Sequence, residues 1–327
     1  MLSKNDIKIM AGNANMRLAS EISGYLGIPL LDSKVGRFAD GEIQMLIYDL
    51  VRGSDVYIIQ STCPPVNENL MELLIMTDAL KRSSCARVTA VMPYFGYARQ
   101  DRKARARDPI SAKLVANLLT TAGVDRILTM DLHAPQIQGF FDIPVDHLEG
   151  TIIFSDMVLD EMKSHPSDGY MLVAPDMGSV NRVRKMADLT DLQIAIIDKR
   201  RLRTNECEVM NVIGDIKGKT AIIVDDMIDT AGTITKAANA VSECGAKRVL
   251  VYASHAILSA DAVQKIEDSK IEKMYLLDTV PIPPEKIIDK FEIVSVAKLF
   301  SEAIYKIYTN TSMSALFKIP GNQGNEK

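Results

Sequence analysis

Short apolar runs that alternate with longer amphipathic stretches constrain this chain more than any other feature. Runs such as residues 55–60 and 220–224 have the length of buried strands, and residues 67–81 carry apolar side chains at helical spacing. Strands joined by intervening helices form βαβ units, whose sheets are mainly parallel. The alternation therefore predicts an α/β fold in which mainly parallel sheets are flanked by helices.

The same alternation runs through both halves of the chain. We expect strands at residues 55–60, 87–92, 126–130, 170–174, 193–197, 220–224 and 248–252, and helices at residues 67–81, 111–122, 179–187 and 233–243. A length of 327 residues has room for two domains at ~150 residues each. We place them at residues 1–148 and 149–309, followed by a tail at 310–327.

A faint internal repeat suggests that the two halves are similar. AGVDRILTMDLHA at residues 122–134 aligns with CGAKRVLVYASHA at residues 244–256. Such a match also arises by chance between two α/β halves, so duplication and coincidence both stay open at this point.

Composition excludes several classes of protein. The longest uncharged apolar runs fall far short of the ~20 residues that a membrane helix needs, and the first ten residues lack a signal-peptide pattern. A net charge of −4 argues against a general nucleic-acid binder. Four scattered cysteines and four histidines leave little scope for a zinc site, so any metal should be a hard cation held by oxygen. We expect a soluble, cytoplasmic protein that binds neither nucleic acid nor membrane.

Two basic clusters stand out on this acidic chain, at residues 99–107 and 199–203. Clusters of this kind are often only solvated surface. They also suit a compact polyanion, because local fields attract phosphates whatever the net charge. The charge pattern alone leaves both interpretations open.

The segment TAIIVDDMIDTAGT, residues 220–233, is the most informative stretch for function. An apolar strand ends in the adjacent carboxylates Asp225 and Asp226, and Asp229 precedes small residues at the start of a helix. Backbone N–H groups at such a helix start can surround a phosphate. Carboxylates at the carboxyl end of a parallel strand can bind sugar hydroxyls or Mg²⁺. The alternative is an acidic helix cap with ordinary turn residues.

This segment resembles the loop that binds 5-phosphoribosyl 1-diphosphate (PRPP) in type I phosphoribosyltransferases and ribose-phosphate pyrophosphokinases. Over about residues 6–317 the chain is similar to the class I, bacterial-type ribose-phosphate pyrophosphokinase family, through FADGE at residues 38–42, YARQDRK at 97–103, MDLHAPQIQGFFDIPVDHL at 130–148, PD at 175–176 and DKRR at 198–201. The resemblance implies two similar type I phosphoribosyltransferase-like domains, with the active site between them. It also implies Mg²⁺-dependent transfer of the β,γ-diphosphoryl group of ATP to the C1 hydroxyl of ribose 5-phosphate, which gives PRPP for nucleotide biosynthesis and AMP.

The resemblance also assigns roles to single residues. It implies ATP binding by Phe38, Asp40, Gly41, Glu42, Arg99 and Gln100. It implies ribose 5-phosphate binding by Arg201, Asp225, Asp226, Asp229, Thr230, Ala231, Gly232 and Thr233. Lys199 and Arg201 match catalytic residues on a loop, about residues 199–208, that we expect to be mobile without ligand. Without the resemblance, Phe38 would be interpreted as a core residue and Arg99 as a surface residue.

Metal and regulatory positions are implied in the same way. His133 and Asp176 match Mg²⁺-associated positions, and for His133 direct ligation and contact through a metal-bound water both stay open. A regulatory site at which ADP inhibits and inorganic phosphate activates matches Arg52, Ser312, Ser314 and Phe317. The family also implies assembly as a homohexamer.

The chain departs from the family pattern in three places. Leu50 replaces a serine in the regulatory site, and because leucine cannot hydrogen-bond to phosphate we expect weaker phosphate activation. Ser179 replaces the second of two glycines, and its Cβ is unfavourable if that turn needs a positive φ or a close backbone approach. We therefore expect weaker affinity at the metal–phosphate side. Ala260 and Asp261 stand where the family tends to have Gly-Pro.

Two other functions remain as alternatives. A non-catalytic regulatory paralogue would bind nucleotide within a synthase assembly, but such proteins disrupt the segments that are intact here at Lys199, Arg201 and residues 225–233. A phosphoribosyltransferase that consumes PRPP would have no use for the N-terminal half.

Overall fold

The computed structural model describes residues 6–200 and 209–317 of the chain. Two compact units divide these residues. Unit 1 takes its described residues from 1–148, 279–281 and 295–316, and unit 2 takes the remainder. The division after residue 148 lies where we expected a domain boundary. Residues 279–281 and 295–309, which we placed in the second domain, and residues 310–316, which we placed in the tail, group instead with unit 1.

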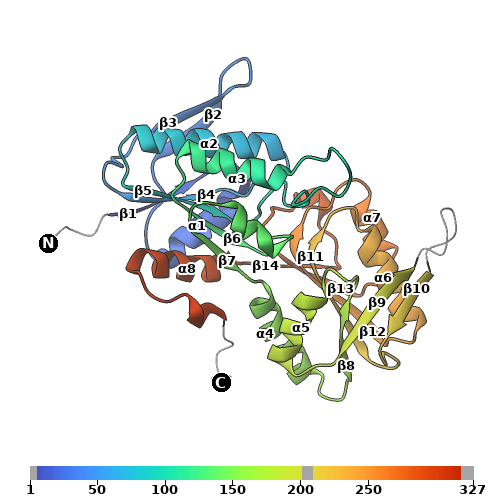
Figure 1. Ribbon diagram of the computed structural model, residues 1–327. Helices are drawn as coiled ribbons and strands as arrows, with labels where there is room; N and C mark the ends of the chain where they lie inside the picture. Colours follow the sequence, from blue (N-terminus) through green and yellow to red (C-terminus); the bar gives the residue numbers. More distant parts are fainter. Residues whose placement is uncertain (1–5, 201–208, 318–327) are drawn as a thin grey trace. The chain divides into compact units, whose positions relative to one another are not determined.

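Unit 1 is built on a parallel sheet of strand order β1-β4-β5-β6-β7. Its elements are β1 (Ile7–Ala11), η1 (Asn13–Asn15), α1 (Met16–Leu26), β2 (Ser33–Arg37), β3 (Ile43–Ile47), β4 (Asp55–Ile59), α2 (Val66–Arg82), β5 (Arg87–Met92), α3 (Ser111–Ala122), β6 (Arg126–Met130), η2 (Pro135–Phe140), β7 (Val145–Leu148) and α8 (Ala297–Thr309). Figure 1 shows α2 and α3 along one face of this sheet, while α1 packs against α8. The strands β2 and β3 form a separate antiparallel hairpin.

Unit 2 is built on a larger sheet of strand order β10-β9-β8-β11-β12-β13-β14. Its elements are α4 (Thr151–Ser164), β8 (Tyr170–Ala174), α5 (Val180–Thr190), β9 (Ile194–Arg200), β10 (Val209–Ile213), β11 (Thr220–Ile228), α6 (Gly232–Glu243), β12 (Arg248–Ala256), α7 (Ala262–Glu267), β13 (Lys273–Leu277), η3 (Pro284–Lys286) and β14 (Phe291–Val294). All neighbouring pairs are parallel except β9 and β10. The helices α6 and α7 lie on one side of the sheet, and α4 packs against α5. A last short helix, η4 (Ser314–Phe317), closes the described chain.

The expected fold class is confirmed, since both sheets are mainly parallel and flanked by helices. The strands predicted at residues 87–92, 126–130 and 170–174 have the predicted bounds as β5, β6 and β8. Continuous apolar sequence explains the central strands, because a strand that pairs on both sides beneath helices is buried on both faces. In β4, for example, all five residues are buried.

The two units share one order of elements, and β1-β4-β5-β6-β7 corresponds to β8-β11-β12-β13-β14. This correspondence supports similar halves, but it differs from the repeat that the sequence suggested. The repeat aligned the segment of β6 with that of β12, whereas the topological equivalent of β12 is β5. The matched letters therefore came from non-equivalent strands with the same buried composition.

The first two residues of the expected catalytic loop belong to a strand. Lys199 and Arg200 belong to β9, where their backbones pair with Met210 and Val209 of β10. The strand predicted at residues 193–197 thus extends further than its apolar run, because the β10 partner stabilises the polar end. Residues 201–208, and Arg201 with them, lie outside the described residues.

Among the described helices, none combines the length and the apolar character needed to cross a bilayer.

Candidate active site

The strand β11 carries the acidic pair Asp225 and Asp226 toward its carboxyl end. Its pairing with β8 stops at Ile223, whereas its pairing with β12 continues to Ile228. The next strand in the chain after β8 is β9, which pairs along one edge of β8. The strand β11 pairs along the opposite edge of β8. This reversal is the topological switch point at which open α/β sheets bind ligands beyond the carboxyl ends of their strands.

The acidic pair is held close together and largely buried. The side chains of Asp225 and Asp226 are 15% and 9% exposed. Arg182 of α5 places its Nη1 3.5 Å from Asp226 Oδ1 and 3.9 Å from Asp225 Oδ1. Burial and the repulsion of Asp226 raise the pKa of Asp225 well above its usual value, and Arg182 opposes the shift. An incoming cation or a set of hydroxyl donors would relieve this repulsion.

The turn after β11 leads directly into α6. Ala231 adopts φ 59° and ψ 0°, a left-handed conformation, and Gly232 begins the helix. Ser259 N donates to Asp229 O at 2.9 Å, which ties the turn to the segment after β12. The hydroxyl-bearing residues Thr230 and Thr233 are exposed. The twelve-residue helix α6 thus begins with small residues at the same sheet edge as the acidic pair.

Asp176 follows β8 at the same switch point. Ser179 N donates to Asp176 Oδ1 at 3.0 Å, and the Ser179 hydroxyl lies 2.9 Å from Asp176 O. Ser179 has φ −84°, so this turn does not need a glycine at the position. The positive φ that would disfavour a serine is therefore absent, while the expected effect of Ser179 on affinity stays a prediction. The conformation of Ser179 is an ordinary right-handed one that any residue adopts.

The residues expected to bind ATP lie in two separate loops of unit 1. The first joins β2 to β3, where Phe38 N donates to Glu42 O at 2.8 Å and Gly41 has φ +95°. The positive φ explains why glycine is favoured at this tight turn. Asp40 Oδ1 accepts from Glu42 N at 3.1 Å, and Phe38 is 50% exposed. An aromatic ring half exposed on a hairpin is available for stacking, so its interpretation as a core residue is excluded.

The second loop follows β5 and contains Arg99 and Gln100, both exposed. Gln100 is fixed by Ala112 N, which donates to Gln100 O at 3.2 Å, and by the hydroxyl of Ser111, 2.5 Å from Gln100 Oε1. Tyr97 adopts φ 64° just before this pair, and its hydroxyl donates to Asn67 of α2. The start of α3 and the first turn of α2 therefore both hold this loop.

His133 is exposed just beyond β6. Its loop is held from β7, because His147 Nε2 accepts from Leu132 N at 2.9 Å. His255, the histidine that the repeat aligned with His133, is 2% exposed in β12 and is therefore a core residue.

The residues expected to form a regulatory site are exposed where their side chains are described. Arg52 lies in the turn before β4, and the hydroxyls of Ser312 and Ser314 are 2.8 Å apart. Leu50 is 78% exposed. Phe317 ends η4. The side chains of Phe317 and Lys199 are not among those that the structure describes.

The donors at the switch point suit a hard cation. Asp176, Asp225 and Asp226 supply carboxylate oxygens, the ligands that Mg²⁺ prefers. Within residues 6–200 and 209–317, no group of three or more acidic, histidine or cysteine side chains forms a ready metal cage. Mg²⁺ commonly takes only one or two protein carboxylates and completes its shell with water and substrate phosphates, so this donor set fits it.

Arg182 of this site was missed in the sequence, and Ser179 was noted there only as a departure from the family pattern. They lie three residues apart, which places them on one face of a helix. The apolar spacing of α5 is the signal that could have drawn attention to them. It places neither residue among the core positions, and yet neither is exposed in the structure. Without the fold, nothing in the sequence pairs Arg182 with a strand more than forty residues away.

Taken together, the doubly represented α/β unit and the acidic strand end followed by a small-residue turn define a phosphoribosyl-binding class of protein. Comparison with known families is consistent with this class. Residues 7–123 match the model of the N-terminal domain of ribose phosphate pyrophosphokinase, and residues 200–318 match a phosphoribosyl synthetase-associated domain.

Similar proteins cover nearly the whole chain. A ribose-phosphate pyrophosphokinase of Caldanaerobacter subterraneus subsp. tengcongensis is 55% identical over 96% of this chain and 98% of its own length. That of Bacillus caldolyticus is 54% identical over 96% and 98%. A crystal structure of phosphoribosylpyrophosphate synthetase from Mycobacterium smegmatis matches with a TM-score of 0.88 at 40% identity, over 94% of this chain and 100% of that one. The chain belongs to the ribose-phosphate pyrophosphokinase family of enzymes.

Proposed function

We propose that the protein transfers the β,γ-diphosphoryl group of ATP to the C1 hydroxyl of ribose 5-phosphate. The C1 oxygen bonds to the β-phosphorus, the bond from that phosphorus to the α,β-bridging oxygen breaks, and AMP leaves while the hydroxyl proton passes to solvent. The products are PRPP, which supplies nucleotide biosynthesis, and AMP. The observation that carries the proposal is the acidic pair Asp225–Asp226 beside the small-residue turn at the switch point of unit 2.

Unit 2 supplies the groups for the sugar phosphate. Asp225 and Asp226 accept hydrogen bonds from ribose hydroxyls or would hold a cation that binds these hydroxyls, and either contact removes part of the repulsion between the two carboxylates. Asp229, Thr230, Ala231, Gly232 and Thr233 surround the 5-phosphate with N–H groups and hydroxyls at the start of α6. Arg201 completes this subsite.

Unit 1 supplies the groups for the nucleotide. Phe38 stacks on adenine, and Asp40 and Glu42 beside Gly41 accept from its exocyclic amine. Arg99 and Gln100 bind the remainder of the nucleotide, and the planar arginine fork suits phosphate oxygens. Their loop is anchored before the ligand arrives, by the contacts of Gln100 with Ser111 and Ala112.

Charge stabilisation and positioning carry the transfer step. Lys199 and Arg201 stabilise the charge that develops on the transferred phosphates, as phosphoryl transfer generally requires. His133 and Asp176 would hold Mg²⁺, which when bound would supply positive charge against the phosphate oxygens. Asp176 is already oriented by Ser179. No side chain is needed as a strong general base, because the work lies in alignment and electrostatics.

The test is an assay of AMP release from ATP with and without ribose 5-phosphate. The proposal predicts that AMP and PRPP form in equal amounts and only when both substrates are present. A non-catalytic paralogue would release no AMP, and a phosphoribosyltransferase would ignore ATP and require a base. A Lys199→Ala variant should lose turnover by about three orders of magnitude or more and still bind ATP.

We also propose a regulatory site at Arg52, Ser312, Ser314 and Phe317, on a homohexamer, that takes ADP and inorganic phosphate. Leu50, exposed beside this arginine, offers no hydrogen bond to phosphate. Activation by phosphate should therefore be shallow, and Leu50→Ser should steepen it. A steep phosphate requirement of the unaltered enzyme in initial-rate assays would contradict this part of the proposal.

A further inference from the structure

Ser179 stands at the start of α5 and is only 2% exposed. A serine at this position would ordinarily cap the helix, but its side chain makes no hydrogen bond to the N–H groups of the first turn. Its hydroxyl instead lies 2.9 Å from Asp176 O and 3.2 Å from Asp176 Oδ1. The hydrogen-bonding capacity of this buried hydroxyl is thus directed at one residue, Asp176.

The contacts on Asp176 are asymmetric. Ser179 N donates to Oδ1 at 3.0 Å, and the Ser179 hydroxyl is within reach of the same oxygen. Among the described residues, no hydrogen-bond donor reaches Oδ2. One carboxylate oxygen is therefore held inside the turn, and the other is left for a ligand.

We propose that Ser179 is a positioning residue that locks the Asp176 carboxylate with Oδ1 in its own turn and presents Oδ2 to the Mg²⁺–phosphate complex. The inference rests on the function proposed above. Mg²⁺ demands short bonds in near-ideal octahedral geometry, so a carboxylate fixed as a single-oxygen ligand binds it better than one that rotates. Second-shell hydrogen bonds orient metal ligands in this way and commonly affect metal affinity strongly.

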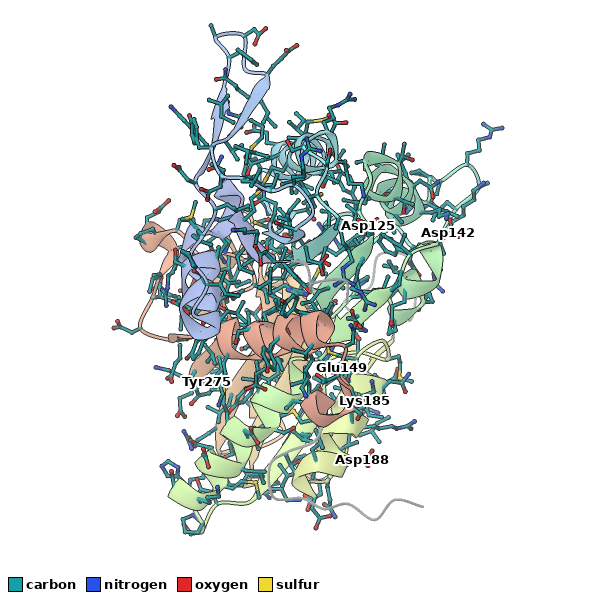
Figure 2. All side chains as sticks on the ribbon, turned by 90° about the vertical axis from the view of Figure 1, so that its left-hand side faces the viewer. Asp125, Asp142, Glu149, Lys185, Asp188 and Tyr275 are labelled. Atoms are coloured by element: carbon teal, nitrogen blue, oxygen red, sulfur yellow. The ribbon has the colours of Figure 1, made fainter. Side chains whose placement is uncertain are left out.

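The helix that bears Ser179 is itself anchored beside the acidic pair. Arg182, one turn further along α5, contacts Asp225 and Asp226. Lys185 forms an ion pair with Glu149 at the start of α4, and Figure 2 shows these two side chains close to each other. The turn that holds Asp176 is therefore fixed relative to the end of β11. Rotation of the Asp176 side chain would then be the remaining source of disorder among the three carboxylates.

Three substitutions separate this role from a general effect on folding. Ser179→Ala and Ser179→Gly both remove the hydroxyl but differ in their effect on the backbone, whereas Ser179→Thr keeps the hydroxyl. Ser155→Ala is the matched control, because Ser155 is a buried serine of α4 whose hydroxyl lacks a partner in the described chain. The free energy of unfolding is measured for all four by chemical denaturation.

The readouts are the concentration of free Mg²⁺ that gives half-maximal AMP release, kcat at saturating Mg²⁺, and direct binding of Mn²⁺. Mn²⁺ binding is followed by electron paramagnetic resonance with ribose 5-phosphate and the non-transferable analogue adenosine 5′-(α,β-methylene)triphosphate, in which carbon replaces the bridging oxygen that would leave. We expect Ser179→Ala and Ser179→Gly to weaken both metal measures equally, by about tenfold. Their kcat at saturating metal should change less than about twofold, and Ser179→Thr and Ser155→Ala should resemble the unaltered protein.

Unchanged Mn²⁺ binding in both Ser179→Ala and Ser179→Gly would overturn the inference, and so would a loss confined to one of them. A loss in Ser179→Thr as large as in Ser179→Ala, at equal stability, would also contradict a role for the hydroxyl. The proposed function fails by a different result, which is the absence of AMP release from the unaltered protein.

Discussion

Unit 1 and unit 2 carry polar side chains at corresponding points of their sheets, after the first strand and after the second. In unit 1, Glu72 of α2 accepts from Asn13 N at 2.5 Å, from Asn13 Nδ2 at 2.9 Å and from Gln60 Nε2 at 2.9 Å. Gln60 Oε1 in turn accepts from Ala14 N at 3.0 Å. A carboxylate of the protein thus accepts from the backbone N–H group at the start of η1.

The corresponding points of unit 2 are arranged in the opposite way. Two carboxylates, Asp225 and Asp226, stand side by side, and Asp176 adds a further negative charge that raises the pKa of Asp225. The positive charge of Arg182 lowers the pKa of Asp225 and so opposes these effects. The comparison indicates that a polar sheet edge is structural where its groups satisfy one another, and functional where like charges are kept together at a cost in stability.

Strand order accounts for this difference. In unit 2 the hairpin strands β9 and β10 continue the main sheet beside β8, which creates the reversal between β8 and β11. In unit 1 the equivalent strands β2 and β3 pair with each other and with no other described strand, so the main sheet runs from β1 to β7 without a reversal. The hairpin is instead available to present Phe38.

The largest expected effect comes from removing one charge of the acidic pair. Asp225→Asn should reduce turnover by about a thousandfold, roughly 4 kcal/mol, because a ligand of the sugar hydroxyls is lost. Its free energy of unfolding at pH 7 should be unchanged or higher, since the repulsion with Asp226 disappears. AMP-release kinetics and urea denaturation measure the two quantities.

The control for this substitution is Asp188→Asn, an exposed position on α5 that Figure 2 labels. It should alter neither turnover nor stability. If Asp225→Asn unfolded more easily than the unaltered protein, the interpretation of unit 2 as an edge with unrelieved repulsion would be contradicted.

Removing the carboxylate of unit 1 should have the opposite outcome. Glu72 is 4% exposed, and Glu72→Gln replaces one of its acceptor oxygens with an NH2 group, so that a donor faces the donors of Asn13 or Gln60. We expect a loss of about 3 kcal/mol in the free energy of unfolding and kcat within about threefold under conditions where the protein stays folded. The exposed Glu302→Gln of α8 serves as control, and a stable Glu72→Gln variant would show that the network is not structural.

The pH dependence of stability sharpens the comparison. The folded-state pKa of Asp225 is raised above its ordinary value of 3.8, so the folded protein holds this proton more tightly than the unfolded chain. The contribution of Asp225 to stability is therefore largest below pH 3.8 and is lost as the pH rises through the raised pKa. The free energy of unfolding of Asp225→Asn, measured by denaturation at a series of pH values, should lack this pH-dependent contribution. A pH dependence identical to that of the unaltered protein would contradict the raised pKa of Asp225.

The smallest effect concerns backbone strain after β12. Ala260 has φ 52°, a left-handed conformation that is unfavourable for residues with a Cβ. Ala260→Gly should therefore stabilise unit 2 by up to about 1 kcal/mol. Ala240→Gly, inside α6, is the matched control and should destabilise it by about 1 kcal/mol. A destabilised Ala260→Gly variant would show that the position is not strained.

Much of the fold follows from the sequence because the core strands are short and continuously apolar. The acidic pair and the small-residue turn were also evident, since strand end, turn and helix start are contiguous at residues 220–233. Local chemistry of this kind needs no knowledge of distant segments.

Other features could not be predicted because they depend on long-range pairing. The polar end of β9 is a strand only because β10 pairs with it, and the grouping of α8 with unit 1 rests on its packing against α1. The buried network around Glu72 joins residues that are up to 59 positions apart. Whether the turn at Ser179 needs a positive φ depends on the folded backbone, so residue type alone could not decide it.

The central claim is that the sugar phosphate binds at the switch point of unit 2, and a crystal structure with ribose 5-phosphate and a non-transferable ATP analogue tests it most directly. The account predicts the 5-phosphate on the N–H groups of residues 229–233, with the ribose hydroxyls at Asp225 and Asp226. A sugar phosphate bound at the Asn13 turn of unit 1, or an empty turn at residues 229–233 with saturating ligand, would contradict it.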